Sequence, residues 1–141
     1  MYLFNRSISV NVCLEGETTL IVNGVFIDSN HELCITLAAD LKSYTITSAD
    51  GELRRAPHPD CVHTQKLIRE LVGVNLNHNV RRQIQAAVGL EHGCTHLTDL
   101  TLECVKGLLQ AKFQLMHRTM SPAEMTIQAE QKLKGSCLHY K

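Results

Sequence analysis

The hydrophobic period of the sequence changes once, around Pro57 and Pro59, and this change leaves few architectures open. Before these prolines, short runs rich in β-branched residues alternate apolar and polar positions, a pattern typical of half-buried strands. After them, apolar residues recur at steps of three, four and seven, a pattern typical of helices that bury one face. Strands followed by helices predict an α+β fold, in which C-terminal helices cover one face of an antiparallel sheet.

Runs of strand-like sequence fill the first half of the chain. They cover residues 3–12, 17–28, 33–37 and 43–49. Turn-forming residues separate them, notably Asp28-Ser29-Asn30, and Asp50-Gly51 closes the last run. Such short connections favour an antiparallel meander. Gly24 lies inside the second run, where it predicts a bulge or a bend.

The helices of the second half have identifiable ends. Asp60 is expected to cap a first helix that runs to Val72, since aspartate is a preferred N-cap. Asn77 is expected to cap a second helix that ends at Val88. Gly93 precedes a long third helix with an apolar stripe.

A final short helix is expected after residue 120. Ser121-Pro122-Ala123-Glu124 has the form of a capping box with proline at the first helical position. We therefore expect residues 1–120 to form a single α+β domain, and residues 121–141 to form a C-terminal helix and a loose tail.

The composition argues against several kinds of partner. The formal net charge is zero and no long block of Lys or Arg occurs, so we expect neither nucleic acid nor an anionic membrane as a partner. Trp is absent and aromatic residues make up 4% of the chain, which disfavours a base-stacking surface. No apolar run reaches the length of a membrane span, and the N-terminus lacks the pattern of a signal peptide. These features predict a cytoplasmic protein.

Five of the six cysteines fall into two groups by position. No C-x-x-C pair occurs, and in a reducing compartment we expect free thiols. Cys61 and Cys94 lie at the starts of expected helices, where the helix dipole stabilises a thiolate, the form that binds metals. Cys13, Cys34 and Cys104 lie inside strand or helix patterns, so we expect them to pack in the core.

Histidines lie directly after the turn at residues 28–30 and close to Cys94. His31 directly follows the turn at residues 28–30, at the mouth of a strand. His96 lies two residues after Cys94, where it could bind a metal, orient the cysteine or face water. His92 is an alternative to His96 in the same stretch.

Two segments carry a resemblance to a known family. The stretches RRAPHPDCVHTQKLIRELVG and GCTHLTDL resemble a family of bacterial proteins of unknown function. That family has a central cysteine before a Leu-Val-Gly helix end, and a GCTHL signature. Its upstream histidine followed by an acid is similar to His31-Glu32. The resemblance covers roughly residues 6 to 115.

The layout is also similar, more distantly, to the iron–sulfur scaffold proteins of the NifU/IscU type, whose fold the SufE sulfur acceptors share. This resemblance implies ligands at His31, Cys61 and Cys94. The first site of the scaffold family usually reads Cys-Gly-Asp, whereas this chain has a histidine there. With His96 or His92 as fourth ligand, the set suits zinc or a [2Fe–2S] cluster.

The leading hypothesis is therefore a metal-binding or iron–sulfur protein with a scaffold or carrier role, and not an enzyme. A cysteine desulfurase or a metalloprotein client would be its partner. One alternative is a sulfur-transfer protein in which Cys61 accepts a persulfide. A second is a structural zinc or interaction domain. A Cys–His hydrolase is disfavoured, because no histidine oriented by an acid is apparent.

Overall fold

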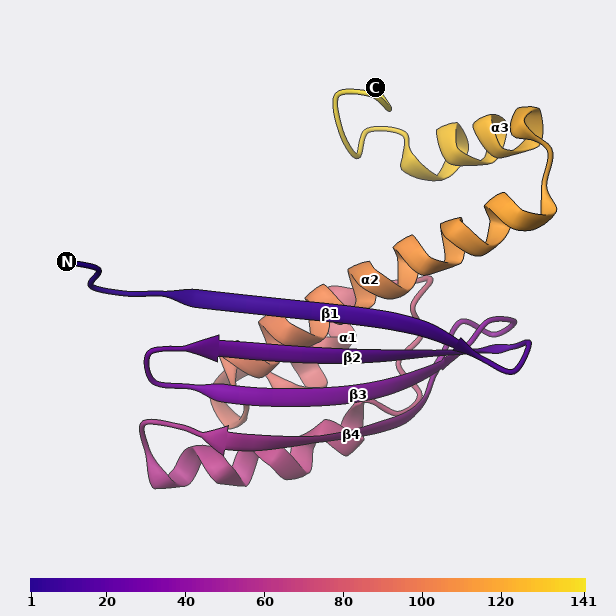
Figure 1. Ribbon diagram of the computed structural model, residues 1–141. Helices are drawn as coiled ribbons and strands as arrows, with labels where there is room; N and C mark the ends of the chain where they lie inside the picture. Colours follow the sequence, from indigo (N-terminus) through magenta and orange to yellow (C-terminus); the bar gives the residue numbers. More distant parts are fainter. The chain divides into compact units, whose positions relative to one another are not determined.

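Four antiparallel strands form one sheet in chain order, so the expected meander is confirmed (Figure 1). The computed structural model describes residues 1–141. The strands are β1 (Arg6–Glu15), β2 (Thr19–Asp28), β3 (Glu32–Asp40) and β4 (Ile46–Arg55). All helices follow the sheet along the chain, and the α+β class expected from the sequence is confirmed.

The helical half contains two 3-10 segments and three α-helices. They are η1 (Pro59–Leu71), α1 (Val80–Val88), η2 (Leu90–His92), α2 (Thr95–Thr119) and α3 (Pro122–Leu133). In Figure 1 the strands lie in front of α1 and of the first part of α2, so both lie on one side of the sheet. None of the helices combines the length and apolar character needed to cross a bilayer.

The core forms between this side of the sheet and α2. Alternate side chains of β2 and β3 point into it and are fully buried, among them Phe26 and Leu37. A Cβ at Gly24 would overlap the sulfur of Cys104, so glycine lets α2 approach β2 closely. The β1–β2 register is continuous through Gly24, and the expected bulge is absent. Cys104 is fully buried, which confirms its expected place in the core.

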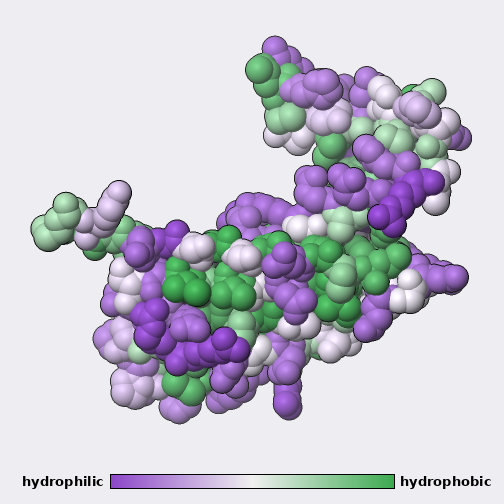
Figure 2. Space-filling view, in the orientation of Figure 1, coloured by the Kyte–Doolittle hydropathy of each residue, from purple (hydrophilic) through white to green (hydrophobic).

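None of the helices that precede residue 110 lies over the opposite face of the sheet. In Figure 2 this face shows apolar areas among hydrophilic ones. The expectation that Cys13 packs in the core is wrong, because it lies on this open face of the edge strand β1 and is exposed. Cys34 lies on the same face and is half-buried. Alternation along a strand fixes which residues share a face, but not which face a helix covers.

β4 extends further than its sequence pattern predicted. It continues through Gly51 to Arg55, although Asp50-Gly51 was expected to close the strand. A Cβ at Gly51 would overlap the backbone oxygen of Cys34 on the neighbouring strand. This glycine therefore permits close packing of β3 and β4, and it does not form a turn.

Two helix starts differ from expectation. The first helical segment is a 3-10 helix that begins at Pro59 after His58, not an α-helix capped by Asp60. Proline suits a first helical position because its missing N–H would have no helical partner there. The second helix starts after Asn79, not after Asn77, and Asn79 takes the left-handed conformation without a capping hydrogen bond from its side chain. Asparagine tolerates this conformation better than most residues.

The chain divides into two compact units, Met1–Leu109 and Gln110–Lys141, with the boundary inside α2. The sheet and its buried face belong to the first unit. The second unit contains α3, which begins with the expected capping box: Ser121 accepts from the N–H of Glu124, and Glu124 accepts from the N–H of Ser121. Residues after Gly135 form hydrogen-bonded turns.

Candidate metal centre

The turn between β2 and β3 is organised by one buried carboxylate. Asp28, the last residue of β2, is 3% exposed. Its Oδ1 accepts hydrogen bonds from the backbone N–H groups of Asn30 (2.9 Å) and His31 (2.8 Å). The same oxygen lies 2.9 Å from Nδ1 of His31. A carboxylate that accepts from the backbone two and three residues later holds a tight turn and fixes the imidazole above it.

Arg55, at the end of β4, braces this turn from outside. Its guanidinium donates to the carbonyl oxygens of Ser29 (2.7 Å) and Asp28 (2.9 Å). Strand pairing explains its position, because Arg55 lies opposite Glu32, the first residue of β3. The backbone around His31 is thus tied to two neighbouring strands.

The first turn of α2 brings a second imidazole to the carboxylate. The rings of His96 and His31 are 3.9 Å apart between centroids and tilted by 33°. Nε2 of His96 lies 3.9 Å from Oδ2 of Asp28. The buried ring of Phe26 contacts His96 edge-on, with centroids 5.2 Å apart. The side chains of His31 and His96 remain partly open to solvent, at 14% and 25% exposure.

The electrostatics of the group favour an ionised carboxylate beside a neutral imidazole. Burial acts to raise the pKa of Asp28, but its hydrogen bonds with Asn30 and His31 outweigh burial and hold the pKa well below its usual range. Burial, followed by the charge of His31, lowers the pKa of His96. A neutral imidazole keeps a free lone pair, which is the form that binds metals.

These three side chains could hold a metal ion. One donor atom from each of Asp28, His31 and His96 lies within 4.8 Å of the other two. Ligands about 2.1 Å from a tetrahedral zinc ion are roughly 3.4 Å apart, so a small inward movement completes the set. Nδ1 of His31, which lies 2.9 Å from Oδ1 of Asp28, is the ring nitrogen on the side of the carboxylate, and it would have to lose its proton to bind an ion together with Asp28.

The structure brings together two of the four ligands expected from the sequence. His31 and His96 meet, whereas Cys61 and Cys94 are not part of this group. Cys61 lies in η1 and Cys94 directly precedes α2, so both occupy the expected helix starts. Nε2 of His92 lies 3.4 Å from a backbone oxygen of α1 and also stands outside the group.

Asp28 is the candidate metal ligand that was not predicted from the sequence. It was interpreted only as a turn former. The available signal was its spacing: an aspartate three residues before a histidine can hold the backbone and the ring of that histidine together. No histidine oriented by an acid was expected either, yet Asp28 and His31 form such a pair.

Comparison with known proteins gives a family without an assigned activity. The family model described as a protein of unknown function (DUF2889) matches residues 4–110. The chain belongs to this family. The matched region contains Asp28, His31 and His96, together with nearly all of the first compact unit. No curated protein and no solved structure matches the chain, so the resemblance to NifU/IscU-type scaffolds gains no support.

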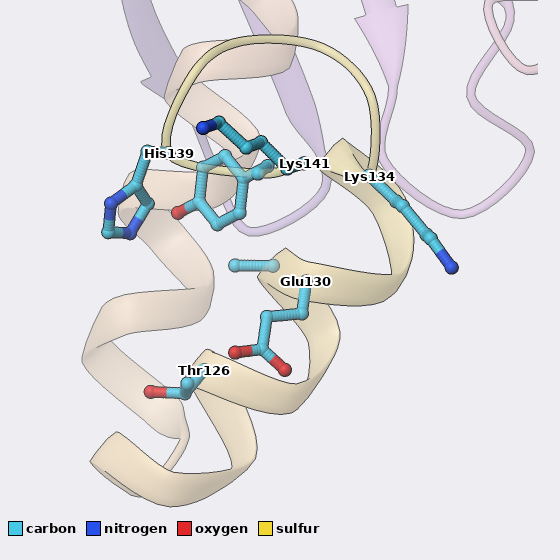
Figure 3. Close-up of a pocket in the computed structure, with 7 residues that line it drawn as sticks. Thr126, Glu130, Lys134, His139 and Lys141 are labelled. Atoms are coloured by element: carbon cyan, nitrogen blue, oxygen red, sulfur yellow. The ribbon is translucent and has the colours of Figure 1, made fainter.

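A separate cavity of about 470 Å³ lies in the second unit, outside the metal-binding group. Figure 3 shows Thr126, Glu130 and Lys134 from the helical side and His139 and Lys141 from the C-terminal turns. Its charged groups have both signs and stand at an exposed surface. This lining specifies no class of ligand.

Proposed function

We propose that this protein binds one divalent transition-metal ion through Asp28, His31 and His96, and that it carries the ion for a partner protein. The observation that supports this proposal is the meeting of three donors from separate elements around a buried, ionised carboxylate. Two imidazoles and one carboxylate suit zinc, and the same set suits ferrous iron.

The donor set favours a single ion over an iron–sulfur cluster. Clusters are held mainly by cysteine thiolates, and the group contains none. The iron–sulfur hypothesis would need Cys61 and Cys94 to join His31. This alternative can be distinguished from a single ion by experiment, because a cluster gives a coloured protein with acid-labile sulfide.

The position of the group favours a carrier over a structural site. Its two imidazoles are partly open to solvent, so an ion can enter and leave without unfolding the chain. Asp28 is already satisfied by hydrogen bonds without an ion. The core is built from other side chains, between the sheet and α2. Three protein ligands also leave at least one coordination position for an exchanging group.

Metal titration of the purified, chelator-treated chain tests the proposal. Zinc should bind with a stoichiometry of one, as measured by calorimetry. His96→Gln should weaken binding at least about tenfold, a loss of roughly 1.4 kcal/mol. His92→Gln is the matched control, because it removes a neighbouring histidine outside the group and should leave the affinity unchanged.

The outcome of these variants separates the alternatives. Equal zinc affinity for wild type and His96→Gln would refute the site. Purification without oxygen, followed by visible spectroscopy and assays for iron and sulfide, tests the cluster. Sulfide that disappears in Cys61→Ala would favour the iron–sulfur alternative, with a cysteine desulfurase as partner, over a single ion.

A further inference from the structure

Arg6 stands beside the metal-binding group without a hydrogen-bonding partner in the protein. It is the cross-strand neighbour of Asp28 in the β1–β2 pair. Its guanidinium lies 3.5 Å from Oδ2 of Asp28, which is an ion-pair contact longer than a hydrogen bond. The group also lies over the rings of Phe26 (4.8 Å) and Phe4 (5.3 Å). Its side chain is 38% exposed, so its donors are accessible.

Binding of a divalent ion to Asp28, His31 and His96 would leave excess positive charge around these side chains. Arg6 and Arg55 contribute one positive charge each, and the ion contributes two. Asp28 and Asp99, whose charge acts on His96, contribute one negative charge each. With both imidazoles neutral, the balance is about +2. The start of α2, a helix of 25 residues, adds the positive end of its dipole.

The distances fit an anion that touches both the ion and Arg6. An ion roughly 2 Å from Oδ2 of Asp28 is at most about 5.5 Å from the nearest guanidinium nitrogen, which is 3.5 Å from that oxygen. A carboxylate can bind the ion through one oxygen at roughly 2 Å and accept from the guanidinium at about 2.8 Å through the other. One carboxylate group can therefore span the distance between the ion and the guanidinium of Arg6.

We infer that the loaded site takes a small carboxylate anion, which coordinates the ion at its open position and pairs with Arg6. This inference rests on the metal site proposed above. The anion neutralises part of the excess charge and completes the coordination of the ion. It also satisfies the fork of donors that the protein leaves open on Arg6. The site therefore recognises the ion together with the carboxylate anion bound to it.

Cobalt(II) replaces zinc as a visible probe in the test. The cobalt-loaded protein is titrated with acetate, and its absorption bands report any change in coordination. Acetate should shift the bands of the wild type with saturation. Arg6→Gln should still bind cobalt but should bind acetate about tenfold more weakly. Arg82→Gln, an exposed arginine on α1, is the matched control and should behave as the wild type.

The measurements distinguish failure of the inference from failure of the metal site. If the wild type does not bind cobalt, both fail. If cobalt binds normally but acetate leaves the bands unchanged, or if Arg6→Gln binds acetate as well as the wild type, only the anion inference is overturned. Circular dichroism of Arg6→Gln is the control that tests whether this variant is folded. Arg6→Lys, which keeps the charge and loses the fork, should bind acetate with intermediate affinity.

Discussion

Replacing Asp28 with asparagine tests the central interaction of the candidate site in the metal-free protein. The substitution keeps the size of the side chain and one acceptor oxygen, but it removes the charge. The amide oxygen can still accept from the N–H groups of Asn30 and His31. What is lost is the charge-assisted part of these bonds and of the contact with Nδ1 of His31, together with the ion pair with Arg6. The amide nitrogen, a donor, would face the guanidinium instead.

The expected loss follows from these contacts. A hydrogen bond to a charged group stabilises a protein by about 1.5–3 kcal/mol, against about 1 kcal/mol for a neutral one. The pair with Arg6 adds little, because its guanidinium is 38% exposed and screened by solvent. The two backbone bonds alone each lose about 1 kcal/mol, so the free energy of unfolding should fall by at least about 2 kcal/mol for Asp28→Asn.

The effect should depend on pH with a definite sign. The pKa of Asp28 is depressed in the folded chain, so its charge contributes stability above the unfolded value of about 3.9. That contribution declines as the pH falls below about 4 towards the lower folded pKa. The difference between wild type and Asp28→Asn should therefore be full at pH 7 and shrink in acid.

Urea unfolding followed by circular dichroism, with a chelator present, measures this difference. At pH 7 the midpoint should fall by at least about 1 M for a slope near 2 kcal/mol/M. Asp50→Asn is the matched control, since Asp50 is an exposed aspartate of β4. Equal midpoints for wild type and Asp28→Asn at pH 7, or an undiminished gap at pH 3, would refute the role assigned to this carboxylate.

Three further outcomes are expected. Removal of metal by a chelator should leave circular dichroism and cooperative melting in place, whereas collapse of the chain would indicate structural zinc. Cys61→Ala combined with Cys94→Ala should retain zinc binding in calorimetry, and loss of binding would return both thiols to the ligand set. In mass-mapped alkylation at neutral pH, Cys137 should react first, because backbone N–H groups lower the pKa of this exposed thiol. Cys104 should react last, because burial raises its pKa to about 12 and hides it, and equal rates would contradict this order.

Features set by neighbouring residues were accessible from the sequence. Alternating apolar positions predicted the strands, and the short connections between them predicted the meander, because both patterns lie within a few neighbouring residues. The apolar stripe expected for the third helix is confirmed, because Leu97, Leu100 and Cys104 of α2 are buried. The capping box at Ser121 needs only four consecutive residues, and it forms as expected.

Features that depend on contacts between elements were less accessible. Gly24 and Gly51 looked like a bend and a turn, but both mark places where another segment approaches the backbone. From the sequence pattern, Cys13 and Cys104 were both expected to be buried in the core. Only the placement of α2 over one face of the sheet buried the second and left the first exposed.

The candidate site shows the same division. The sequence determined that donors lie at element ends, with His31 after a turn and His96 in the first turn of a helix. By position alone, Cys61 and Cys94 were equally good candidates. The strand register put Arg6 opposite Asp28, and packing of α2 brought His96 over the β2–β3 turn. Only the tertiary structure selected these partners, because local sequence fixes which way a side chain points from its own element and packing decides what it meets.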